Sequence, residues 1–388
     1  DISLSRPLWG FGGTLSGGYD YSYTDLKYPE LGFDLGAEKY HEHSFSLEYR
    51  QSLLKNRGGL NDRLAVDLKE FELARLKLQY QEEYEAFILG AEKQYLNWRF
   101  LYQQTQIATE RLDLARQALS QSKELFDAGV IDKIDWLRAN YAARSAQEQY
   151  QLAVTDFDAE TQRLVTLYDW DRYELPEPAP VVYVPLPPEQ SEGRSRLLQL
   201  HHLDIDQLRR AEASYEDALR PDIDVVLSQT FSSAAEGFGN STDFDRPTSY
   251  IALDITETFG KEAERAQLDQ NQRAIRAAEL RKDAEYRQLE AARKQGMTRL
   301  QSLYEILLLN QEQLNLAEAE QEEEAALYAQ GRSQLLTLIQ TQDQLAARLL
   351  SYAQLLRDYL SQRAEYLALL DVLPVPERES LDWMEDAE

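Results

Sequence analysis

Few residues of this 388-residue chain could carry out catalysis or bind a metal. It has 4 histidines, and two of them, His41 and His43, lie on one side of an extended segment, where paired imidazoles could hold a surface metal ion. A solvent-facing loop in an acidic protein is the favoured interpretation of that pair. No glycine-rich phosphate loop follows a strand, and no Ser/His/Asp arrangement is evident. We therefore predict no enzyme activity, no cofactor and no metal site.

The composition excludes several kinds of partner. Lys and Arg number 41 against 68 Asp and Glu, so the formal net charge is −27. Nucleic-acid phosphates and anionic membrane surfaces both require clustered Lys and Arg, so neither is an expected ligand. Cysteine is absent, which rules out disulfides, thiolate zinc ligands and a cysteine nucleophile and leaves the cellular compartment open.

The chain has no run of about 18 apolar residues that would predict a transmembrane helix. No basic segment followed by an apolar one opens the sequence as a signal peptide would. Because the first residue is Asp1, we expect a processed or trimmed chain rather than a cytosolic start.

The sequence contains an internal duplication. A shift of 202 residues brings the two halves into register without a gap, and it places Gly58 on Gly260 and Gly129 on Gly331. Glycine and tyrosine matches are more specific than matches among Ala, Leu and Glu, which often arise by chance in helical sequence. A fold built from two copies of one unit is therefore expected.

Each half contains two strand-like runs, a very long helix, a glycine turn and a second long helix. The first long helices are expected at about 61–127 and 261–330, each on the order of 100 Å long at ~1.5 Å per residue. Glycines suited to the left-handed backbone follow both, so return helices are expected at about 132–168 and 333–370. Such rods require an extended protein or a bundle with other chains.

The apolar period changes along the first long helix. From Leu73 to Tyr102 the steps average about 3.6, the period of a nearly straight helix. Towards the glycine turn the apolar residues follow a heptad, which indicates a left-handed coiled coil. A single amphipathic helix with an irregular pattern is the alternative. The heptad positions are Leu101, Thr105, Ala108, Leu112, Ala115, Leu119, Ser122 and Phe126.

A proline-rich segment separates the two halves. Its prolines between residues 168 and 190 are spaced too closely for a helix, although residues 181–184 could form a short strand. A helical pattern resumes at about 191 and stops at Pro221. By the shift of 202 residues, Asp1 would align with Leu203 inside that helix, so the first half lacks most of the corresponding helix.

Four runs alternate apolar and polar residues and are rich in strong β formers, which predicts strands at 14–24, 44–50, 222–231 and 249–256. Their length is about that of a tilted strand crossing a bilayer, roughly 9–11 residues. A small soluble sheet capping a helical bundle is the alternative. The aromatic residues expected at the membrane interface are Tyr19, Tyr21, Tyr23, Tyr49 and Phe231.

The number of strands sets the expected oligomer. Four strands leave two open edges, which hydrocarbon does not tolerate, so the sheet must close with strands from other chains. Two copies would give about eight strands and a barrel filled by side chains, whereas three would give about twelve and leave a passage. A homotrimer is therefore expected.

Taken in this order, the elements resemble the TolC-like outer membrane factor (outer membrane efflux protein) family. The turn from Leu125 to Ala139 looks like that family's first helical-tip motif, and the segment from Leu327 to Arg332 looks like its second. The resemblance covers about residues 14–370. It implies a mainly α protein with a small β part, in which long antiparallel coiled-coil helices form a periplasmic α-barrel. It also implies four transmembrane β-strands per chain, joined in a trimeric 12-stranded β-barrel in the outer membrane of a Gram-negative bacterium.

The resemblance also divides the chain. The divisions are 1–57 for the first β-hairpin of the barrel, 58–168 for the first helical pair, 169–190 for an equatorial proline-rich segment, 191–220 for the helix of the second repeat, 221–258 for the second β-hairpin, 259–370 for the second helical pair and 371–388 for an equatorial C-terminal tail.

A channel gate is implied at the helical tip. Asp135 matches an Asp of the family's constricting network and Tyr328 matches its Tyr partner; for Asp135, simple helix N-terminal electrostatics is the alternative. Family members often carry acidic rings at the positions of Thr337 and Gln340, so Asp343, one turn further on, is the substitute candidate. An Arg that often follows the second tip glycine by two is Ser333 here, with Arg332 displaced by one. The residues implied to dock an adaptor are Gly129, Val130, Gly331 and Ser333.

The implied function is that of the outer-membrane channel of a tripartite efflux or type I secretion system. The implied partners are a periplasmic adaptor (membrane fusion) protein and an inner-membrane pump of the resistance-nodulation-division or ABC type. A soluble or periplasmic coiled-coil scaffold without a pore is the alternative. Drugs, metal ions, polysaccharides and proteins all fit such a tube as substrates.

Overall fold

The computed structural model describes residues 1–25, 39–169 and 195–373. The chain divides into two compact units, the first made of residues 1–79 and 197–285 and the second of residues 80–196 and 286–388. The segments predicted to be equatorial, 169–190 and 371–388, lie outside the described residues except for Asp169 and residues 371–373. The strand suggested at 181–184 also lies outside them.

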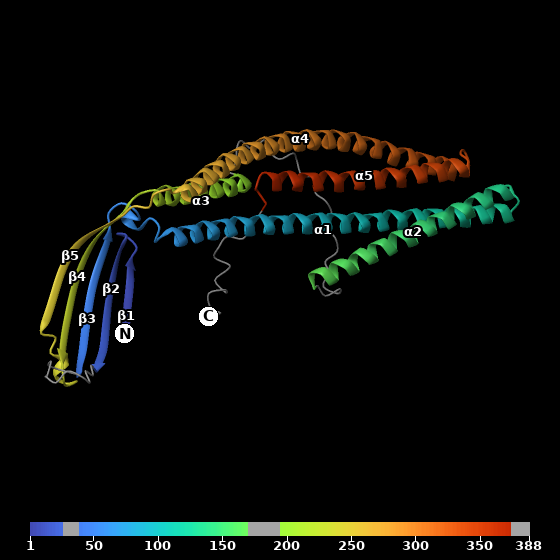
Figure 1. The fold of residues 1–388 in the computed structure, drawn as a ribbon. Coiled ribbons are helices and arrows are strands. Elements are labelled where there is room, and N and C mark those ends of the chain that lie inside the picture. The colour runs from blue at the N-terminus through green and yellow to red at the C-terminus, as the bar shows by residue number, and fades with distance from the viewer. Residues whose placement is uncertain (26–38, 170–194, 374–388) are drawn as a thin grey trace, which may run out of the picture. The chain divides into compact units, whose positions relative to one another are not determined.

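The first unit contains one antiparallel sheet whose strands follow chain order, with β1 and β5 at its two edges (Figure 1). Alternating apolar and small polar residues with many Tyr, Val and Ile favour strands here. The four strands predicted at 14–24, 44–50, 222–231 and 249–256 are confirmed. The strands are β1 (Ile2–Leu8), β2 (Gly13–Asp25), β3 (Lys39–Ser52), β4 (Asp222–Ala235) and β5 (Arg246–Thr256).

The sheet has one strand more than the sequence predicts. β1 pairs antiparallel with β2 from Ile2 opposite Tyr19 to Leu8 opposite Gly13. It escaped prediction because it is short and contains Pro7, which an edge strand tolerates since that position needs no ladder N–H. The shift of 202 residues aligns β1 with part of α3 (Arg196–Ala218), so the two halves differ in structure at this point.

The long helices begin and end close to their predicted limits. α1 (Leu64–Asp127) and α4 (Glu262–Ala329) each precede a glycine turn, and α2 (Lys133–Tyr168) and α5 (Leu335–Leu369) follow one. Short 3-10 turns lie at Arg57–Gly59 and Asn240–Thr242. Among the helices of the described chain, none has an apolar stretch sufficient for a membrane span.

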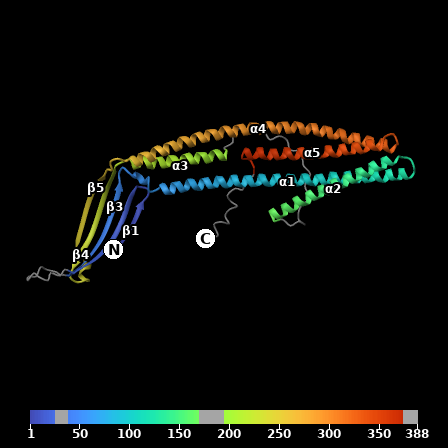
Figure 2. The ribbon, with the colours of Figure 1, turned by 45° about the vertical axis from the view of Figure 1, so that its right-hand side comes forward.

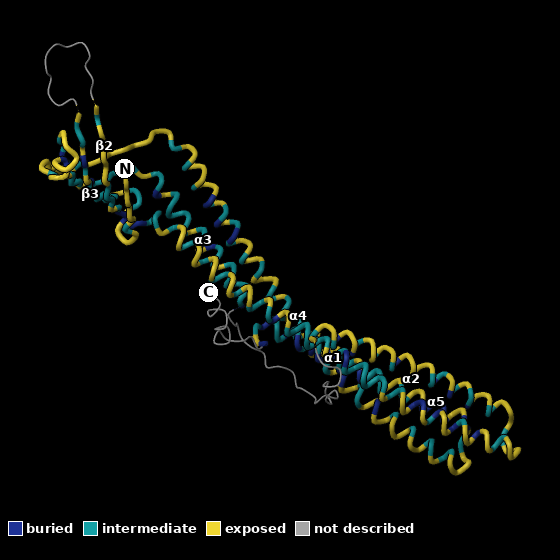
Figure 3. Tube along the Cα trace, turned by 90° about the horizontal axis from the view of Figure 1, so that it is seen from below, coloured by how far each residue is buried: buried dark blue, intermediate teal, exposed yellow. Residues whose placement is uncertain are grey.

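In the second unit α2 returns along α1 and α5 returns along α4 (Figure 2). The heptad predicted near the tip is confirmed as packing surface, because Leu112, Ala115 and Ser122 are buried. The alanines of α2, Ala143 and Ala146, pack against this seam and allow the helices to approach closely. The core consists of small clusters, one between α1 and α2, one that joins these two helices to α5, and one that joins α1, α4 and α5. Few residues of the helices are fully buried in the single chain (Figure 3).

A larger cluster joins α1, α4 and α5 in the middle of the second unit. Leu96, Leu300 and Tyr359 are buried in it, together with Leu356 and Tyr366. A buried hydrogen bond nearby runs from the Trp98 indole N–H to the Thr161 hydroxyl oxygen at 2.8 Å and fixes α1 against α2. In contrast, the N-terminal part of the apolar stretch that runs from Leu73 to Tyr102 is exposed in the single chain at Leu73, Leu76 and Phe87.

Candidate functional site

The two faces of the sheet have opposite chemistry. Directly paired residues lie on the same face, so the registers assign each side chain to one of two sets. One face carries mainly Ser, Thr, Asp and Glu. The other is apolar and largely exposed. Its large side chains are Ile2, Leu4, Leu15, Tyr19, Tyr21, Tyr23, Phe45, Leu47, Tyr49, Leu227, Phe231, Ile251, Leu253 and Ile255.

All five residues predicted at the membrane interface lie on this apolar face. Tyr19, Tyr21 and Tyr23 occupy the half of β2 that is farther from the helices, whereas Tyr49 lies near the end of β3 that leads into α1. Phe231 lies opposite Phe45 in the middle of the β3–β4 pairing. The structure therefore distributes tyrosines towards both ends of the apolar face.

The two histidines singled out in the sequence lie within an aromatic cluster on the same face. The Tyr19 hydroxyl is 2.6 Å from His43 Nδ1, and the Tyr21 hydroxyl is 2.8 Å from His41 Nδ1. The Phe238 ring packs edge-on over both imidazoles, at centroid distances of 5.2 Å and 5.7 Å. His43 is buried, so the pair does not lie in the solvent loop that the sequence suggested.

The polar face carries a charge network near the helices. Arg50 donates to Asp224 at 3.1 Å and to Asp254 at 3.0 Å, which links β3, β4 and β5. Acidic residues outnumber arginines on this face. The acidic residues are Asp20, Glu42, Glu48, Asp222, Asp224 and Asp254.

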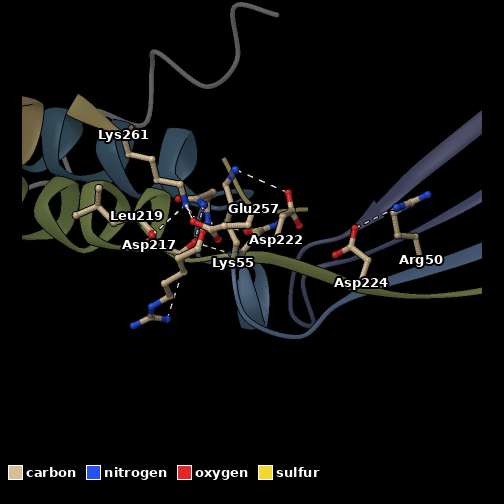
Figure 4. Close-up of polar contacts among 11 residues, drawn as sticks. Arg50, Lys55, Asp217, Leu219, Asp222, Asp224, Glu257 and Lys261 are labelled. Carbon is tan, nitrogen blue, oxygen red and sulfur yellow. Dashed lines mark hydrogen bonds and ion pairs between the residues drawn. The ribbon is translucent and has the colours of Figure 1, made fainter. Parts of the chain in front are cut away.

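The junction between the sheet and the helices is tightly hydrogen-bonded (Figure 4). The buried carboxylate of Asp217 accepts from the backbone N–H of Asn56 at 2.6 Å and from the Asn61 side chain at 2.9 Å. Lys261 donates to the carbonyls of Leu219 and Arg220, which follow the end of α3. Carbonyls at a helix end have no intrahelical partner, so a lysine placed there stabilises the end. These bonds tie the end of α3 to the segments that lead into α1 and α4.

The two helical tips have the same backbone structure. Gly129 and Gly331 both have φ of +69°, in the left-handed region. The N–H of each glycine bonds three residues back, and the next N–H bonds five residues back, to Leu125 in one tip and Leu327 in the other. This is a Schellman motif, which ends a helix and reverses the chain. A Cβ added at either glycine would meet no atom within 4 Å, so only the backbone angle requires glycine.

Five of the predicted tip residues line one groove of about 860 Å³: Val130, Asp135, Tyr328, Gly331 and Ser333. Tyr328 packs against a buried cluster that includes Ala118 and Leu335. Burial raises the pKa of the Tyr328 hydroxyl, and the negative charge of the nearby Asp135 raises it further. Asp135 and Tyr328 therefore share one groove, and Asp135 forms an ion pair of 3.3 Å with Arg138. The pairing of Asp135 with Tyr328 stays a prediction.

Asp343 lies apart from that group. It pairs with Arg111 at 2.6 Å and lines a second groove of about 350 Å³ with Arg138 and Tyr141. The Arg111 side chain is only 5% exposed, and it also contacts the Gln342 side chain. Arg111 was missed from sequence because nothing in the heptad marks one charged residue of α1 as buried. Arg332 is not among the residues that line either groove, and its guanidinium contacts Gln330.

Sequence reasoning also missed a buried carboxylate cluster in the second unit. Glu82, Glu85 and Asp371 place oxygens within 4.8 Å of one another. Arg196 ion-pairs with all three, at 2.6 Å to Glu82 and 3.3 Å to Asp371. Burial raises the pKa of the Glu85 and Asp371 carboxyls. Because a guanidinium already occupies the centre, we interpret this cluster as a structural ion-pair network.

Comparison with known proteins finds one matching family. Residues 10–168 match the family model described as outer membrane efflux protein. The matched segment runs from the turn before β2 to the end of α2, and the second half repeats its elements at the shift of 202 residues. The chain is similar to the outer membrane efflux protein family over this segment. No curated protein matches this sequence.

Solved structures of low sequence identity share the fold. The outer membrane protein VceC from Vibrio cholerae is 13% identical, with a TM-score of 0.68 over 92% of this chain and 87% of VceC. CusC is 16% identical, with a TM-score of 0.65 over 92% of this chain and 83% of CusC. The CmeC channel of Campylobacter jejuni is 11% identical, with a TM-score of 0.65 over 96% of this chain and 80% of CmeC.

These comparisons confirm the predicted fold class, with five strands in the sheet where four were expected. The matched family model is described as outer membrane efflux protein, and VceC and CmeC are described as an outer membrane protein and an outer membrane channel.

Proposed function

We propose that this protein is the outer-membrane channel of a tripartite efflux or type I secretion system and that it works as a homotrimer. The observation that supports this most directly is the sheet itself. One face is apolar and exposed, the other is polar, and both edges are open. A membrane-spanning barrel wall has these properties once its edges are closed by other copies.

The apolar face would contact lipid and the polar face would line the water-filled passage. Because apolar and polar side chains alternate along each strand, the same strand can contact lipid with one face and water with the other. The tyrosines towards the two ends of the apolar face would lie at the two membrane interfaces, where their apolar rings and polar hydroxyls both find suitable surroundings. The residues concerned are Tyr19, Tyr21, Tyr23 and Tyr49. Phe231, also predicted at an interface, lies in the middle of the β3–β4 pairing and would contact lipid between the two interfaces.

Helical packing supports assembly with other copies. In the single chain many large apolar side chains of α1 and α4 are exposed, among them Leu73, Phe87, Leu280 and Leu316. Contiguous exposed apolar surface on a helix marks an interaction site. Three copies would bring these faces together around a periplasmic tube.

The channel would close at the helical tip. Asp135 and Tyr328 line the tip groove together, whereas Asp343 is held by Arg111 and Arg332 lies outside the groove. Polar side chains that bridge neighbouring helices would hold the tips together. A periplasmic adaptor docked at Gly129, Val130, Gly331 and Ser333 would favour the splayed form and shift the equilibrium towards the open channel. An inner-membrane pump of the resistance-nodulation-division or ABC type would deliver the substrate.

A coiled-coil scaffold without a pore is the competing function. It would leave the apolar face of the sheet in water, which a soluble protein avoids. The channel and the scaffold can be distinguished with purified protein. We expect a detergent-dependent trimer by light scattering and discrete conductance steps in a planar bilayer. A monomer that stays soluble without detergent would refute the channel.

Gating can be tested on the same preparation. Tyr328→Phe and Asp135→Asn each remove a polar group from the tip groove, so we expect a several-fold increase in the open fraction of single channels. Tyr286→Phe, on α4 and outside both grooves, is the matched control and should leave the open fraction unchanged. Unchanged gating in both tip variants would refute the role of this pair while leaving the channel itself intact.

A further inference from the structure

The edge of β2 is occupied by β1, not left open. Seven residue pairs join the two strands, from Ile2 opposite Tyr19 to Leu8 opposite Gly13. β1 follows the polarity of the sheet, with Ile2 and Leu4 on the apolar face and Ser5 on the polar one. β5 forms the other edge (Figure 1).

Strand direction makes β1 incompatible with closure of an antiparallel barrel. In a five-stranded antiparallel sheet the first and last strands run in the same direction. Cyclic symmetry would then place β5 of one copy parallel to β1 of the next. Without β1, the seam joins β5 to β2, which run in opposite directions, and every strand pair becomes antiparallel. Outer-membrane barrels are antiparallel throughout and have even strand numbers.

The lengths of β2 and β5 suit a direct seam between them. β2 has 13 residues and β5 has 11. A tilted membrane-spanning strand needs roughly 9–11 residues, so both strands are long enough to cross the bilayer side by side.

We infer that β1 covers the edge of β2 in the single chain and that β5 of a second copy displaces it when the barrel closes. This inference rests on the proposed trimer. An exposed strand edge invites pairing with any other chain, so a covering strand protects the protomer before assembly. After the displacement, the edge of β2 pairs with the edge of β5 from a neighbouring copy. No strand edge is then left unpaired in the membrane.

The internal repeat specifies the register of the new seam. By the shift of 202 residues, Gln51 of β3 corresponds to Leu253 of β5. Gln51 pairs with Gly13 of β2, and Leu253 pairs with Val225 of β4. Gly13 therefore corresponds to Val225. The β3–β4 seam inside one chain is then the template for the β5–β2 seam between copies. It places the pairs Ile251 with Leu15, Tyr250 with Ser16 and Arg246 with Asp20. The Ile251–Leu15 pair would bring two apolar side chains together on the apolar face, and the Arg246–Asp20 pair would bring opposite charges together on the polar face.

A disulfide lock tests the displacement, because the chain contains no cysteine of its own. Ser5 and Ser16 are directly paired, so S5C/S16C would tie β1 to β2. In an oxidising periplasm we expect the locked variant to give less than about a tenth of the wild-type trimer, and reduction to restore it. The matched control is S16C/E48C, which ties β2 to β3, strands that stay neighbours in either arrangement. It should assemble normally.

A second variant does not depend on the lock. S16C/Y250C should form disulfides between copies in the assembled trimer and yield covalent trimers on a denaturing gel. Wild-type trimer yield from oxidised S5C/S16C would overturn the inference, as would a trimeric S16C/Y250C that never cross-links. Either result would leave the proposed function standing, whereas a wild-type protein that is monomeric in every detergent would refute the proposed function itself.

Discussion

Asp169 and Asp371 adopt the same left-handed backbone, with φ of 53° and 57°, at the ends of α2 and α5. They are separated by the shift that also superimposes Gly58 on Gly260 and Gly129 on Gly331, and all four glycines have positive φ. The duplication is therefore repeated in backbone conformation at the start, the tip and the end of each helical pair. These are the places where the chain must change direction.

The tip glycines lead to the first prediction. Val at residue 129 or 331 would have to adopt the left-handed backbone, at a cost of roughly 1–2 kcal/mol, or deform the turn. We expect Gly129→Val and Gly331→Val to abolish export, measured as the host's susceptibility to a panel of toxic substrates, while trimers persist on semi-native gels. Gly129→Asn is the control, since Asn tolerates this backbone region. Normal export from both Val variants would remove the docking role of the tips.

The Arg111–Asp343 pair leads to a prediction about stability. Asp343→Asn leaves a buried guanidinium with a weaker partner, so we expect a loss of about 1–3 kcal/mol, measured by chemical denaturation in detergent. Asp113→Asn is the control, because Asp113 pairs with Arg116 at the surface, where ion pairs contribute only about 0–1 kcal/mol. Equal losses in the two variants would mean that burial of Arg111 has no energetic consequence.

The carboxylate cluster leads to a prediction about pH. Burial raises the pKa of Glu85 above its ordinary value of 4.5, so the folded state binds this proton more tightly than the unfolded state. The contribution of Glu85 to stability is therefore greatest below pH 4.5 and falls as the pH rises through the folded-state pKa. We expect the thermal stability of Glu85→Gln relative to wild type to increase as the pH is raised above 4.5. Glu83→Gln, at an exposed position on the same helix, is the control and should show no such change. A difference in thermal stability between Glu85→Gln and wild type that does not vary with pH would contradict the raised pKa of Glu85.

The polar face of the sheet leads to a prediction about ion selectivity. Its acidic residues outnumber its arginines, so the passage should favour cations. Reversal potentials under a salt gradient should show cation preference, which Asp224→Asn/Asp254→Asn weakens and Arg50→Gln strengthens. Asp25→Asn, on the opposite face, is the control. An anion preference in the wild-type channel would contradict the assignment of this face to the passage.

Much of the architecture could be predicted because its signals are local. The heptad around Leu112 marks a packed seam, the glycines at 129 and 331 mark reversals, and period-two alternation marks four of the strands. The glycine positions also identified the duplication. β1 escaped prediction because seven residues with a proline give a weak local signal, and its pairing with β2 depends on a partner strand.

The composition and periodicity of this sequence were sufficient to determine the long helices, the two-faced strands and the repeat. The family resemblance came from the two helical-tip motifs and the order of the elements. Only the tertiary structure decided that Arg111 is buried against Asp343, that Arg196 lies among three carboxylates and that β1 covers the edge of β2. The physical reason is that periodicity reports which face of an element is apolar, and neighbours two residues away in a strand or three to four away in a helix are enough to define it. The partner of a charged side chain or of a strand edge lies tens to hundreds of residues away, and no local pattern encodes which one it meets.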